Sequence, residues 1–184
     1  YTTEHTLSLK FPTIFNVLGP LTNPARASRQ VIGVYDEGLV PLMAQALARL
    51  GCVRAMVAHS RDGLDEVSIT APTLVATVAD GRLSMDELDP RPLVPHLDLA
   101  AIDRSQLVAA DTEAAAGMIR DVLAGVPGPR AEFVVVNAAA ALFVAGLAPD
   151  LRAGCSMARE AIASGKAGKA LERLVEVSKA GAGG

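Results

Sequence analysis

Residues 30–59, QVIGVYDEGLVPLMAQALARLGCVRAMVAH, contain the pattern that decides the fold. The apolar, β-branched run at 30–35 predicts a buried strand, and the run at 54–59 predicts a second one. Between them, apolar residues recur at helical spacing over 38–50, and Gly51 stands where a helix-capping glycine is expected. A strand, a helix and a strand in this order predict a βαβ unit, whose two strands are parallel and joined by a right-handed crossover.

The rest of the chain predicts further strands, a hairpin and several helices. Strands are expected at 66–69, 73–79 and 82–88, with Asp80-Gly81 as the hairpin turn between the last two. Helices are expected at 103–123 (one helix or two closely joined ones), at 133–144, from a cap at Asp150 to 163, and from a cap at Ser164 to 179. The stretch 134–136 is also compatible with a strand.

These elements predict an α/β fold with one mixed, largely parallel sheet that is flanked by helices. A chain of 184 residues is long enough for one ordinary domain with a sizeable core. We expect this single domain over residues 1–179, followed by a disordered tail at 180–184, AGAGG.

Composition argues against several classes of protein. Hydrophobic residues make up 51% of the chain and charged residues 20%, whereas disordered chains combine low hydrophobicity with high net charge. The net charge of -3 provides no basic excess for binding a nucleic-acid backbone. We therefore expect a globular protein with no nucleic-acid partner.

The cysteines and the longest apolar stretch indicate the cellular environment. Cys52 and Cys155 lie far apart and outside any CxxC motif, which argues against a disulfide scaffold or a structural zinc site and fits the reducing cytoplasm. The apolar stretch 133–148 is shorter than a membrane span and is interrupted by Asn137. No membrane association is expected.

The strongest candidate for a metal site follows the second predicted strand, in the segment SRDGLDE at 60–66. Asp62-Gly63 predicts a turn, after which Asp65 and Glu66 place adjacent carboxylates at the C-terminal end of a parallel strand, where ligands bind in open α/β sheets. Carboxylates with no His or Cys beside them suit Mg²⁺, which also takes water and substrate phosphate oxygens. The alternative is a solvated acidic turn.

A candidate for ligand binding is the segment PTIFNVLGPLTNPA at 12–25. Gly19-Pro20 and Asn23-Pro24 predict two stiff turns in apolar surroundings, because proline fixes φ and glycine lets the backbone approach a ligand closely. Such a segment can form a rigid wall, with exposed backbone amides, for a small planar ligand. A plain structural connector is the alternative.

The sequence offers no catalytic nucleophile and no phosphate-binding glycine loop. It contains no Walker A motif, no GxGxxG fingerprint after the first strand and no GxSxG elbow. His59 is close in sequence to the carboxylates and could act as a general base. We favour instead a strand-end histidine that hydrogen-bonds to backbone groups.

Several segments taken together resemble the anthranilate phosphoribosyltransferases. They are PTIFNVLGPLTNPA, VIGVY, HSRDGLDEVS, VVVNAAAALFVAG and AREAIASGKAGKALERLV. They occur in the family's order from Phe11 to Val177, and the FNxLGPLxNPA and GLDE motifs are highly specific as a pair. The resemblance implies the α/β fold of the C-terminal domain shared by nucleoside phosphorylases and these phosphoribosyltransferases.

The resemblance also implies an activity. The family transfers the phosphoribosyl group of PRPP to the amine of anthranilate and releases pyrophosphate, in tryptophan biosynthesis. By this similarity Asp65 and Glu66 hold Mg²⁺ on the PRPP diphosphate, and Gly19 lies against anthranilate. Because the amine is already a nucleophile, no residue of this chain is expected to act as a catalytic acid, base or nucleophile. The family usually forms homodimers through a small N-terminal helical domain.

The sequence departs from the family in its upstream part. The family binds the PRPP phosphates with GTGGD-type, NxST and KHGN segments upstream of FNxLGPL, and this chain has none of them. The position of the family's anthranilate-binding arginine holds Thr6, with Lys10 the nearest basic residue, and Pro12 stands where many members carry arginine. Either the acceptor site is divergent or residues 1–10 are not the family's segment. We expect the C-terminal α/β portion of a longer enzyme, inactive alone.

Two other functions remain open at this point. A nucleoside phosphorylase shares the fold, although that family lacks the LGPLTNP segment. A non-catalytic relative that binds a ligand or a partner is compatible with Thr6 at the acceptor position.

Overall fold

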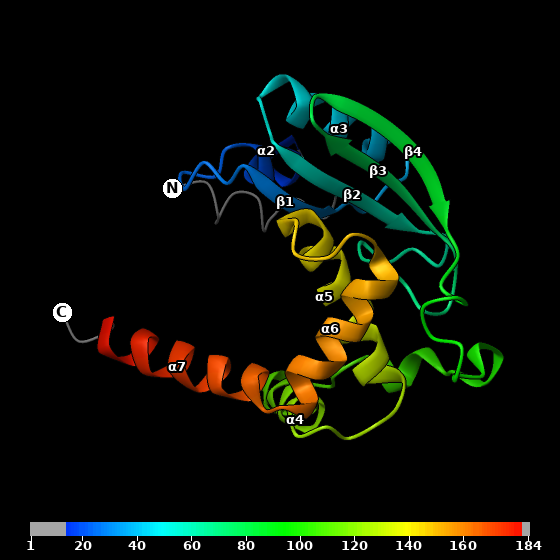
Figure 1. Ribbon diagram of the computed structural model, residues 1–184, viewed down its shortest axis with the longest axis vertical. Coiled ribbons are helices and arrows are strands. Elements are labelled where there is room, and N and C mark those ends of the chain that lie inside the picture. Colours follow the sequence, from blue (N-terminus) through cyan, green and yellow to red (C-terminus); the bar gives the residue numbers. More distant parts are fainter. Residues whose placement is uncertain (1–13, 182–184) are drawn as a thin grey trace.

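The computed structural model describes residues 14–181, and a sheet with the strand order β1-β2-β3-β4 forms the upper part of the molecule in Figure 1. The strands are Arg29–Gly33 (β1), Arg54–Ser60 (β2), Thr73–Ala79 (β3) and Arg82–Leu88 (β4). β1 and β2 are parallel, whereas β2–β3 and β3–β4 are antiparallel pairs. The βαβ unit expected from residues 30–59 is confirmed.

The sheet is mixed and flanked by helices, as expected, but it is not largely parallel, because only one of the three strand pairs in the described region is parallel. Asp80 and Gly81 have φ of 50° and 73°, as in the two-residue turns that join antiparallel strands. Residues 61–72 contain no helix and return the chain beside β2 in the opposite direction. The strand expected at 66–69 is wrong, because these residues belong to that connection.

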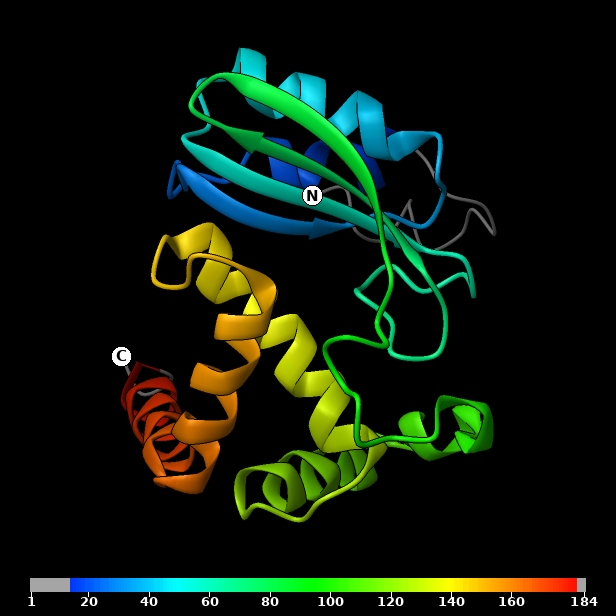
Figure 2. The same cartoon turned by 45° about the vertical axis from the view of Figure 1, so that its right-hand side comes forward.

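Helices cover both faces of the sheet, with α3 on one face and α5 on the other (Figure 2). They are α2 (Ile14–Leu21), α3 (Leu39–Arg49), α4 (Thr112–Leu123), α5 (Pro129–Ala145), α6 (Leu151–Ala163) and α7 (Lys166–Gly181), with 3₁₀ turns at Leu99–Ala101 and Arg104–Leu107. None of the helices in residues 14–181 is long and apolar enough to cross a membrane.

The helix predictions are confirmed in type and corrected at several boundaries. The helix expected over 133–144 is part of α5, so the strand alternative is wrong, and the stretch 103–123 divides into a 3₁₀ turn and α4. Asp150 caps α6 by accepting a 2.8 Å hydrogen bond from the Ala153 amide. Ser164 ends α6 instead of beginning α7.

The expected disordered tail is corrected in part. α7 continues through Ala180 to Gly181, because its helical backbone extends past Lys179. Residues 182–184 lie outside the described part of the chain.

The central strand β2 separates two hydrophobic cores. Ala55 and Val57 pack on the side of α3, whereas Met56 and Ala58 pack on the side of α5 and α6. All four residues are buried, because successive side chains of a strand point to opposite faces and both faces are covered.

Two arginines at the start of the parallel strands hold the C-terminal end of α5. Arg29 of β1 donates a 2.8 Å hydrogen bond to the Val144 carbonyl, and Arg54 of β2 donates a 3.2 Å bond to the Phe143 carbonyl. The Arg54 guanidinium also lies 5.4 Å from the centre of the Phe143 ring. Because the last carbonyls of a helix lack helical partners and carry partial negative charge, these cations fix α5 against the sheet.

A buried carboxylate holds the opposite end of α5. Glu132 accepts a 2.5 Å hydrogen bond from Arg159 of α6, and its other oxygen lies 3.2 Å from Nε2 of His96. Arg159 also donates a 2.9 Å bond to the Leu93 carbonyl, which fixes the loop after β4 to both helices. The side chain of Glu132 is 11% exposed, and these partners offset the cost of burying a carboxylate.

Glu132→Ala should lower the free energy of unfolding by about 2–3 kcal/mol, because it leaves the partly buried Arg159 without its carboxylate partner. This loss is smaller than that for a fully buried ion pair, because water still reaches part of Arg159. Urea unfolding would measure the loss. Glu176→Ala, on the exposed side of α7, is the matched control and should change stability by less than about 0.5 kcal/mol. Equal stability of the two variants would contradict the role of this cluster.

Candidate functional site

The candidate site is the turn at 61–72, which leaves the C-terminal end of β2 and packs on the end of β1. A Cβ atom on residue 33 would lie 1.5 Å from the carbonyl oxygen of Asp65 and 2.5 Å from its carbonyl carbon. Only glycine therefore allows the turn to approach β1 this closely. This contact places Asp65 at the C-terminal edge of the two parallel strands, as the sequence predicted.

Within the turn, Asp62 is a centre of hydrogen bonds. Its Oδ2 accepts a 2.7 Å bond from the Ser68 hydroxyl and a 2.5 Å bond from the Thr70 hydroxyl. Burial alone would raise the pKa of Asp62. The hydrogen bonds from Thr70, Ser60, Ser68 and the Leu64 amide together lower it by more than burial raises it, so the pKa of Asp62 is below its ordinary value. The charged form of Asp62 thus stabilises the turn.

Asn137 of α5 holds the turn from the other side. Its Oδ1 accepts a 3.0 Å bond from the Val67 amide, and its Nδ2 donates a 2.9 Å bond to the Val67 carbonyl. The side chains of Val67 and Ile69 are buried in the core next to α5. The N–H and C=O groups of Val67 therefore pair with a side-chain amide instead of a neighbouring strand, although residues 66–69 alternate polar and apolar side chains.

The acidic pair is presented outward on this fixed turn. Asp65 and Glu66 are both exposed to solvent. Partial burial, and then the negative charge of Asp65, raise the pKa of Glu66 above its ordinary value. A bound cation would relieve this repulsion, and exposed carboxylate oxygens are ligands that Mg²⁺ accepts, so the residues present fit the ion.

The pair alone does not complete a metal site. The described residues contain no group of three or more His, Cys, Asp or Glu side chains that could hold a metal ion. The remaining ligands of a Mg²⁺ ion would therefore have to be water or substrate oxygens, as is usual for this ion.

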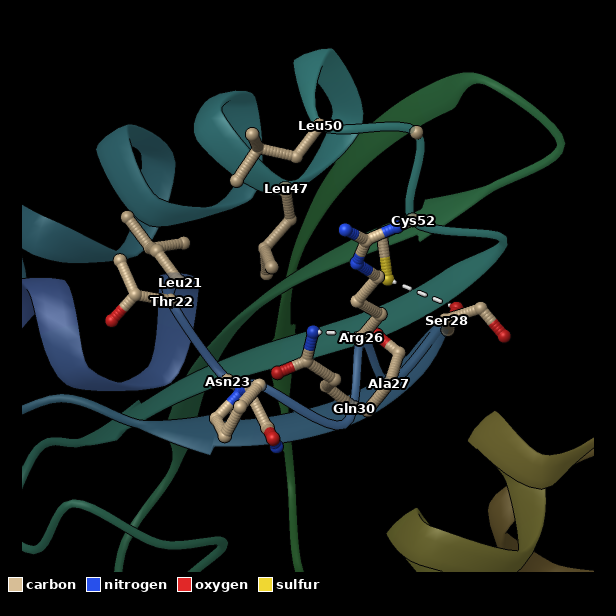
Figure 3. Close-up of a pocket in the computed structure, with 12 residues that line it drawn as sticks. Leu21, Thr22, Asn23, Arg26, Ala27, Ser28, Gln30, Leu47, Leu50 and Cys52 are labelled. Carbon is tan, nitrogen blue, oxygen red and sulfur yellow. Dashed lines mark hydrogen bonds between the residues drawn. The ribbon is translucent and has the colours of Figure 1, made fainter.

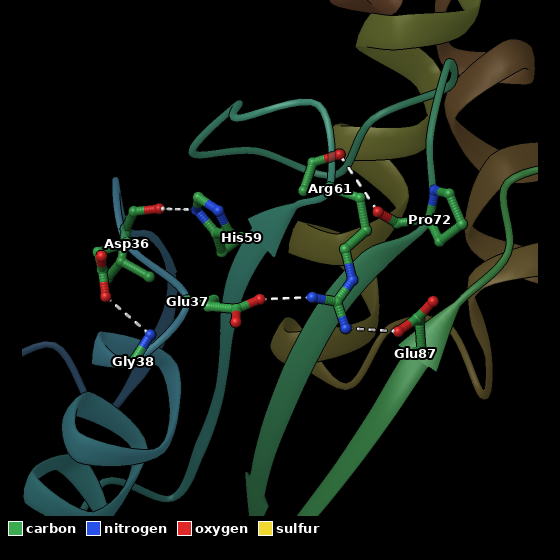
Figure 4. Close-up of polar contacts among 9 residues, drawn as sticks. Asp36, Glu37, Gly38, His59, Arg61, Pro72 and Glu87 are labelled. Atoms are coloured by element: carbon green, nitrogen blue, oxygen red, sulfur yellow. Dashed lines mark hydrogen bonds and ion pairs between the residues drawn. The ribbon is translucent and has the colours of Figure 1, made fainter.

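His59 is engaged in the structural contact that we favoured from the sequence. Its Nδ1 donates a 2.8 Å hydrogen bond to the Val34 carbonyl, which ties β2 to the residue after β1 (Figure 4). This bond holds the β1 end on which the acidic turn rests.

Arg61, which sequence reasoning did not single out, connects three elements near the site. Its guanidinium pairs with Glu37, in the β1–α3 loop, and lies 2.8 Å from Glu87 of β4 (Figure 4). No local sequence signal indicates this contact, because both partners are distant in the chain. All three side chains are at least 44% exposed, so the ion pairs add little stability.

Gly19 lies inside α2, so the stiff turn expected at Gly19-Pro20 is wrong. Among the described residues, a Cβ on Gly19 would meet no atom within 4 Å, and Gly19 itself is exposed. The turn at Asn23-Pro24 is confirmed, since the Asn23 side chain accepts a 2.9 Å bond from the Ala25 amide. Thr6, Lys10 and Pro12 fall outside the described residues.

A separate pocket of about 420 Å³ lies at the opposite, N-terminal end of β1, between the α2–β1 connection and the end of α3 (Figure 3). Two of its polar side chains are engaged within the protein, since Gln30 donates to the Ala27 carbonyl and the Cys52 thiol donates to the Ser28 carbonyl. Burial raises the pKa of the Cys52 thiol, which keeps it in the unreactive protonated form. Nothing there provides chemistry comparable to the acidic turn.

The chain is similar in sequence and in fold to known proteins. Residues 1–168 match the family described as "Glycosyl transferase family, a/b domain". The chain is 47% identical over 167 residues to an anthranilate phosphoribosyltransferase of Desulfatibacillum aliphaticivorans, covering 91% of this chain and 48% of the relative. It is 45% identical over 176 residues to that of Rubrobacter xylanophilus, covering 95% of this chain and 50% of the relative.

Solved structures agree with the sequence relatives. The anthranilate phosphoribosyltransferase of Thermus thermophilus superposes with a TM-score of 0.81 at 36% identity, covering 93% of this chain and 49% of that one. The Saccharomyces cerevisiae enzyme in complex with PRPP and Mg superposes with a TM-score of 0.80 at 27% identity, covering 95% and 50%. The chain thus spans about half the length of the relatives that it matches.

Gly33→Ala should destabilise the protein by about 3 kcal/mol or more, because the new Cβ meets backbone atoms of Asp65 that cannot move without displacing the turn. Gly117→Ala, in α4, is the matched control: its Cβ would meet no atom within 4 Å, and alanine in a helix should add about 0.5–1 kcal/mol. Thermal unfolding of both variants measures the difference. A Gly33→Ala variant as stable as wild type would show that the turn does not rest on β1.

Asp62→Asn should lower stability most at neutral pH. The folded-state pKa of Asp62 is lowered, so its contribution is fully present above the ordinary carboxyl value of about 4 and is lost as the pH falls through the folded pKa. Urea unfolding at a series of pH values should show the difference between variant and wild type shrinking below about pH 4. Asp121→Asn, on the exposed side of α4, should follow wild type throughout. A constant deficit for Asp62→Asn would contradict the lowered pKa.

Proposed function

The chain belongs to the glycosyl transferase family of a/b-domain proteins, and we propose that it forms the α/β portion of an anthranilate phosphoribosyltransferase. This portion would act in the transfer of the phosphoribosyl group of PRPP to the amine of anthranilate. The observation that carries the proposal is the acidic turn, fixed at the C-terminal edge of the parallel strands in a fold that superposes on an enzyme in complex with PRPP and Mg.

In this function Asp65 and Glu66 would hold Mg²⁺ on the diphosphate of PRPP. When bound, the ion would neutralise negative charge on the departing pyrophosphate. The turn contributes by keeping the two carboxylates in one place: Gly33 supports Asp65 from β1, and Asn137 holds Val67 from α5. Catalytic groups that are already positioned need little reorganisation during the reaction.

No proton-transfer residue is required of this chain. The aromatic amine of anthranilate is a nucleophile without activation by a base, and His59 is already bonded to the Val34 carbonyl. The acceleration would come from positioning and from stabilisation of charge on the leaving group. By the resemblance we assign Gly19 to the wall of the anthranilate site, since this exposed glycine carries no side chain that would keep a planar ring away from α2.

The other parts of the proposal rest on the resemblance and on the names of the relatives. The phosphate-binding segments for PRPP, the helical domain and homodimer formation would belong to the half of the relatives that this chain does not match. A cytoplasmic location is proposed because both cysteines, Cys52 and Cys155, are free and buried, which suits a reducing compartment. The relatives and structures described above are all anthranilate phosphoribosyltransferases, which favours this activity over a nucleoside phosphorylase or a non-catalytic protein.

Joining the upstream half of the Desulfatibacillum aliphaticivorans relative in register to this chain should give an enzyme that consumes anthranilate when PRPP and Mg²⁺ are present. Loss of anthranilate fluorescence measures the rate. Replacing Asp65 and Glu66 together by alanine should lower kcat/KM by about 100-fold or more, because charge neutralisation by a metal is worth several kcal/mol. The 184-residue chain alone should be inactive.

The matched control replaces Glu172 and Glu176 of α7, which removes the same charge from an exposed helix away from the turn. This variant should keep a rate within about twofold of the parent, in line with the small effects of surface substitutions. A folded chimera without turnover would refute the proposed function. Equal rates in the two double variants would refute the role of the acidic pair.

A further inference from the structure

Asn137 is the only polar residue in the apolar stretch FVVVNAAAALFV at 133–144. The side chain of Asn137 is half-buried, and all three of its hydrogen bonds go to backbone groups. Nδ2 donates to the Phe133 carbonyl, one helical turn back, at 3.0 Å and to the Val67 carbonyl at 2.9 Å, while Oδ1 accepts from the Val67 amide at 3.0 Å. A polar side chain on an apolar helix face is costly to bury without hydrogen-bond partners, and these three bonds supply the partners of Asn137.

The contact reaches across 70 residues of sequence to the position directly after Glu66. The primary amide of Asn137 pairs with both the N–H and the C=O of Val67, as a neighbouring strand would. On the other side of Glu66, the carbonyl group of Asp65 rests against Gly33. The backbone on either side of Glu66 is thus fixed by two different elements, α5 and β1.

We propose that Asn137 is a positioning residue that fixes the acidic pair in its metal-holding arrangement. The inference rests on the proposed function, because it assumes that Asp65 and Glu66 hold Mg²⁺. With the bonds to Val67 intact, the backbone that carries Glu66 has one conformation before the ion arrives. Without them, the ion must order that residue itself, and ordering one backbone residue weakens binding by roughly tenfold.

Asn137→Ala removes the whole amide, and Asn137→Ser provides a second variant in case the first unfolds. A serine hydroxyl in a helix can bond to the carbonyl one turn back, here that of Phe133, but is too short to reach Val67. Val144→Ala is the matched control, because it truncates another buried side chain of α5 that lies at the end held by Arg29. It should loosen the core that Val144 shares with Val67 and Ile69 while leaving the hydrogen bonds between Asn137 and Val67 in place.

The first measurement is amide hydrogen exchange of the 184-residue chain without metal. Both Asn137 variants should increase exchange over residues 61–72 by at least about tenfold, since the Val67 amide loses its acceptor, while β2 remains protected. Val144→Ala should leave exchange in the turn unchanged. Protection of the turn equal to wild type in both Asn137 variants would overturn the inference before any ligand is added.

The second measurement is Mn²⁺ binding, followed by electron paramagnetic resonance, to the chimeric two-half protein in the presence of PRPP. The Asn137 variants should bind Mn²⁺ about tenfold more weakly and need about tenfold more Mg²⁺ for half-maximal rate, with kcat at saturating Mg²⁺ within about twofold. Val144→Ala should match the parent in both. A merely structural role of Asn137 would lower stability and leave the metal dependence unchanged.

The outcomes separate the two proposals. If the parent chimera binds no Mn²⁺ in the presence of PRPP, the assignment of the metal to Asp65 and Glu66 is wrong. The positioning role of Asn137 is then wrong as well. If the parent binds Mn²⁺ and the Asn137 variants bind it equally well, the inference alone is overturned. Weaker binding in both Asn137 variants, with Val144→Ala unchanged, supports it.

Discussion

The close approach of Asp65 to Gly33 is the constraint on which the rest of the site depends. The carbonyl oxygen of Asp65 occupies the place of a side chain on residue 33, so the turn at 61–72 can lie directly on the end of β1. β1 itself is fixed by its parallel pairing with β2, and Asn137 of α5 holds the turn at Val67. The position of the acidic pair is therefore set by the sheet and by α5.

Three carboxylates within five residues have opposite environments in this turn. Asp62 points inward, where hydroxyl and amide donors lower its pKa despite burial and use its charge to hold the turn together. Asp65 and Glu66 point outward, where the pKa of Glu66 is raised by partial burial and by the neighbouring charge. The inward carboxylate stabilises the turn, whereas the outward pair is exposed to solvent, where a bound cation would relieve its repulsion.

Much of this arrangement could be predicted from sequence, because it depends on local patterns. The βαβ unit, the Asp80-Gly81 hairpin and the position of the acidic turn follow from periodicity and turn chemistry. The strand predicted at 66–69 was wrong because Asn137, 70 residues away, satisfies the backbone of Val67. The largely parallel sheet was wrong for a similar reason: only the fold shows that β3 returns beside β2. Partners distant in sequence, such as Glu37 and Glu87 for Arg61, leave no local signal.

Under the proposed function, the turn at 61–72 has, before any ligand binds, the conformation in which it would hold a metal ion against PRPP. The most direct measurement is a crystal structure of the chimeric two-half protein with Mn²⁺ and PRPP, in which anomalous scattering locates the metal. The expected result is a Mn²⁺ ion coordinated by carboxylate oxygens of Asp65 and Glu66 at about 2.0–2.2 Å, with the backbone of the turn unchanged and Asn137 still bonded to Val67. A metal ion bound elsewhere, or a turn rebuilt around it, would contradict this claim.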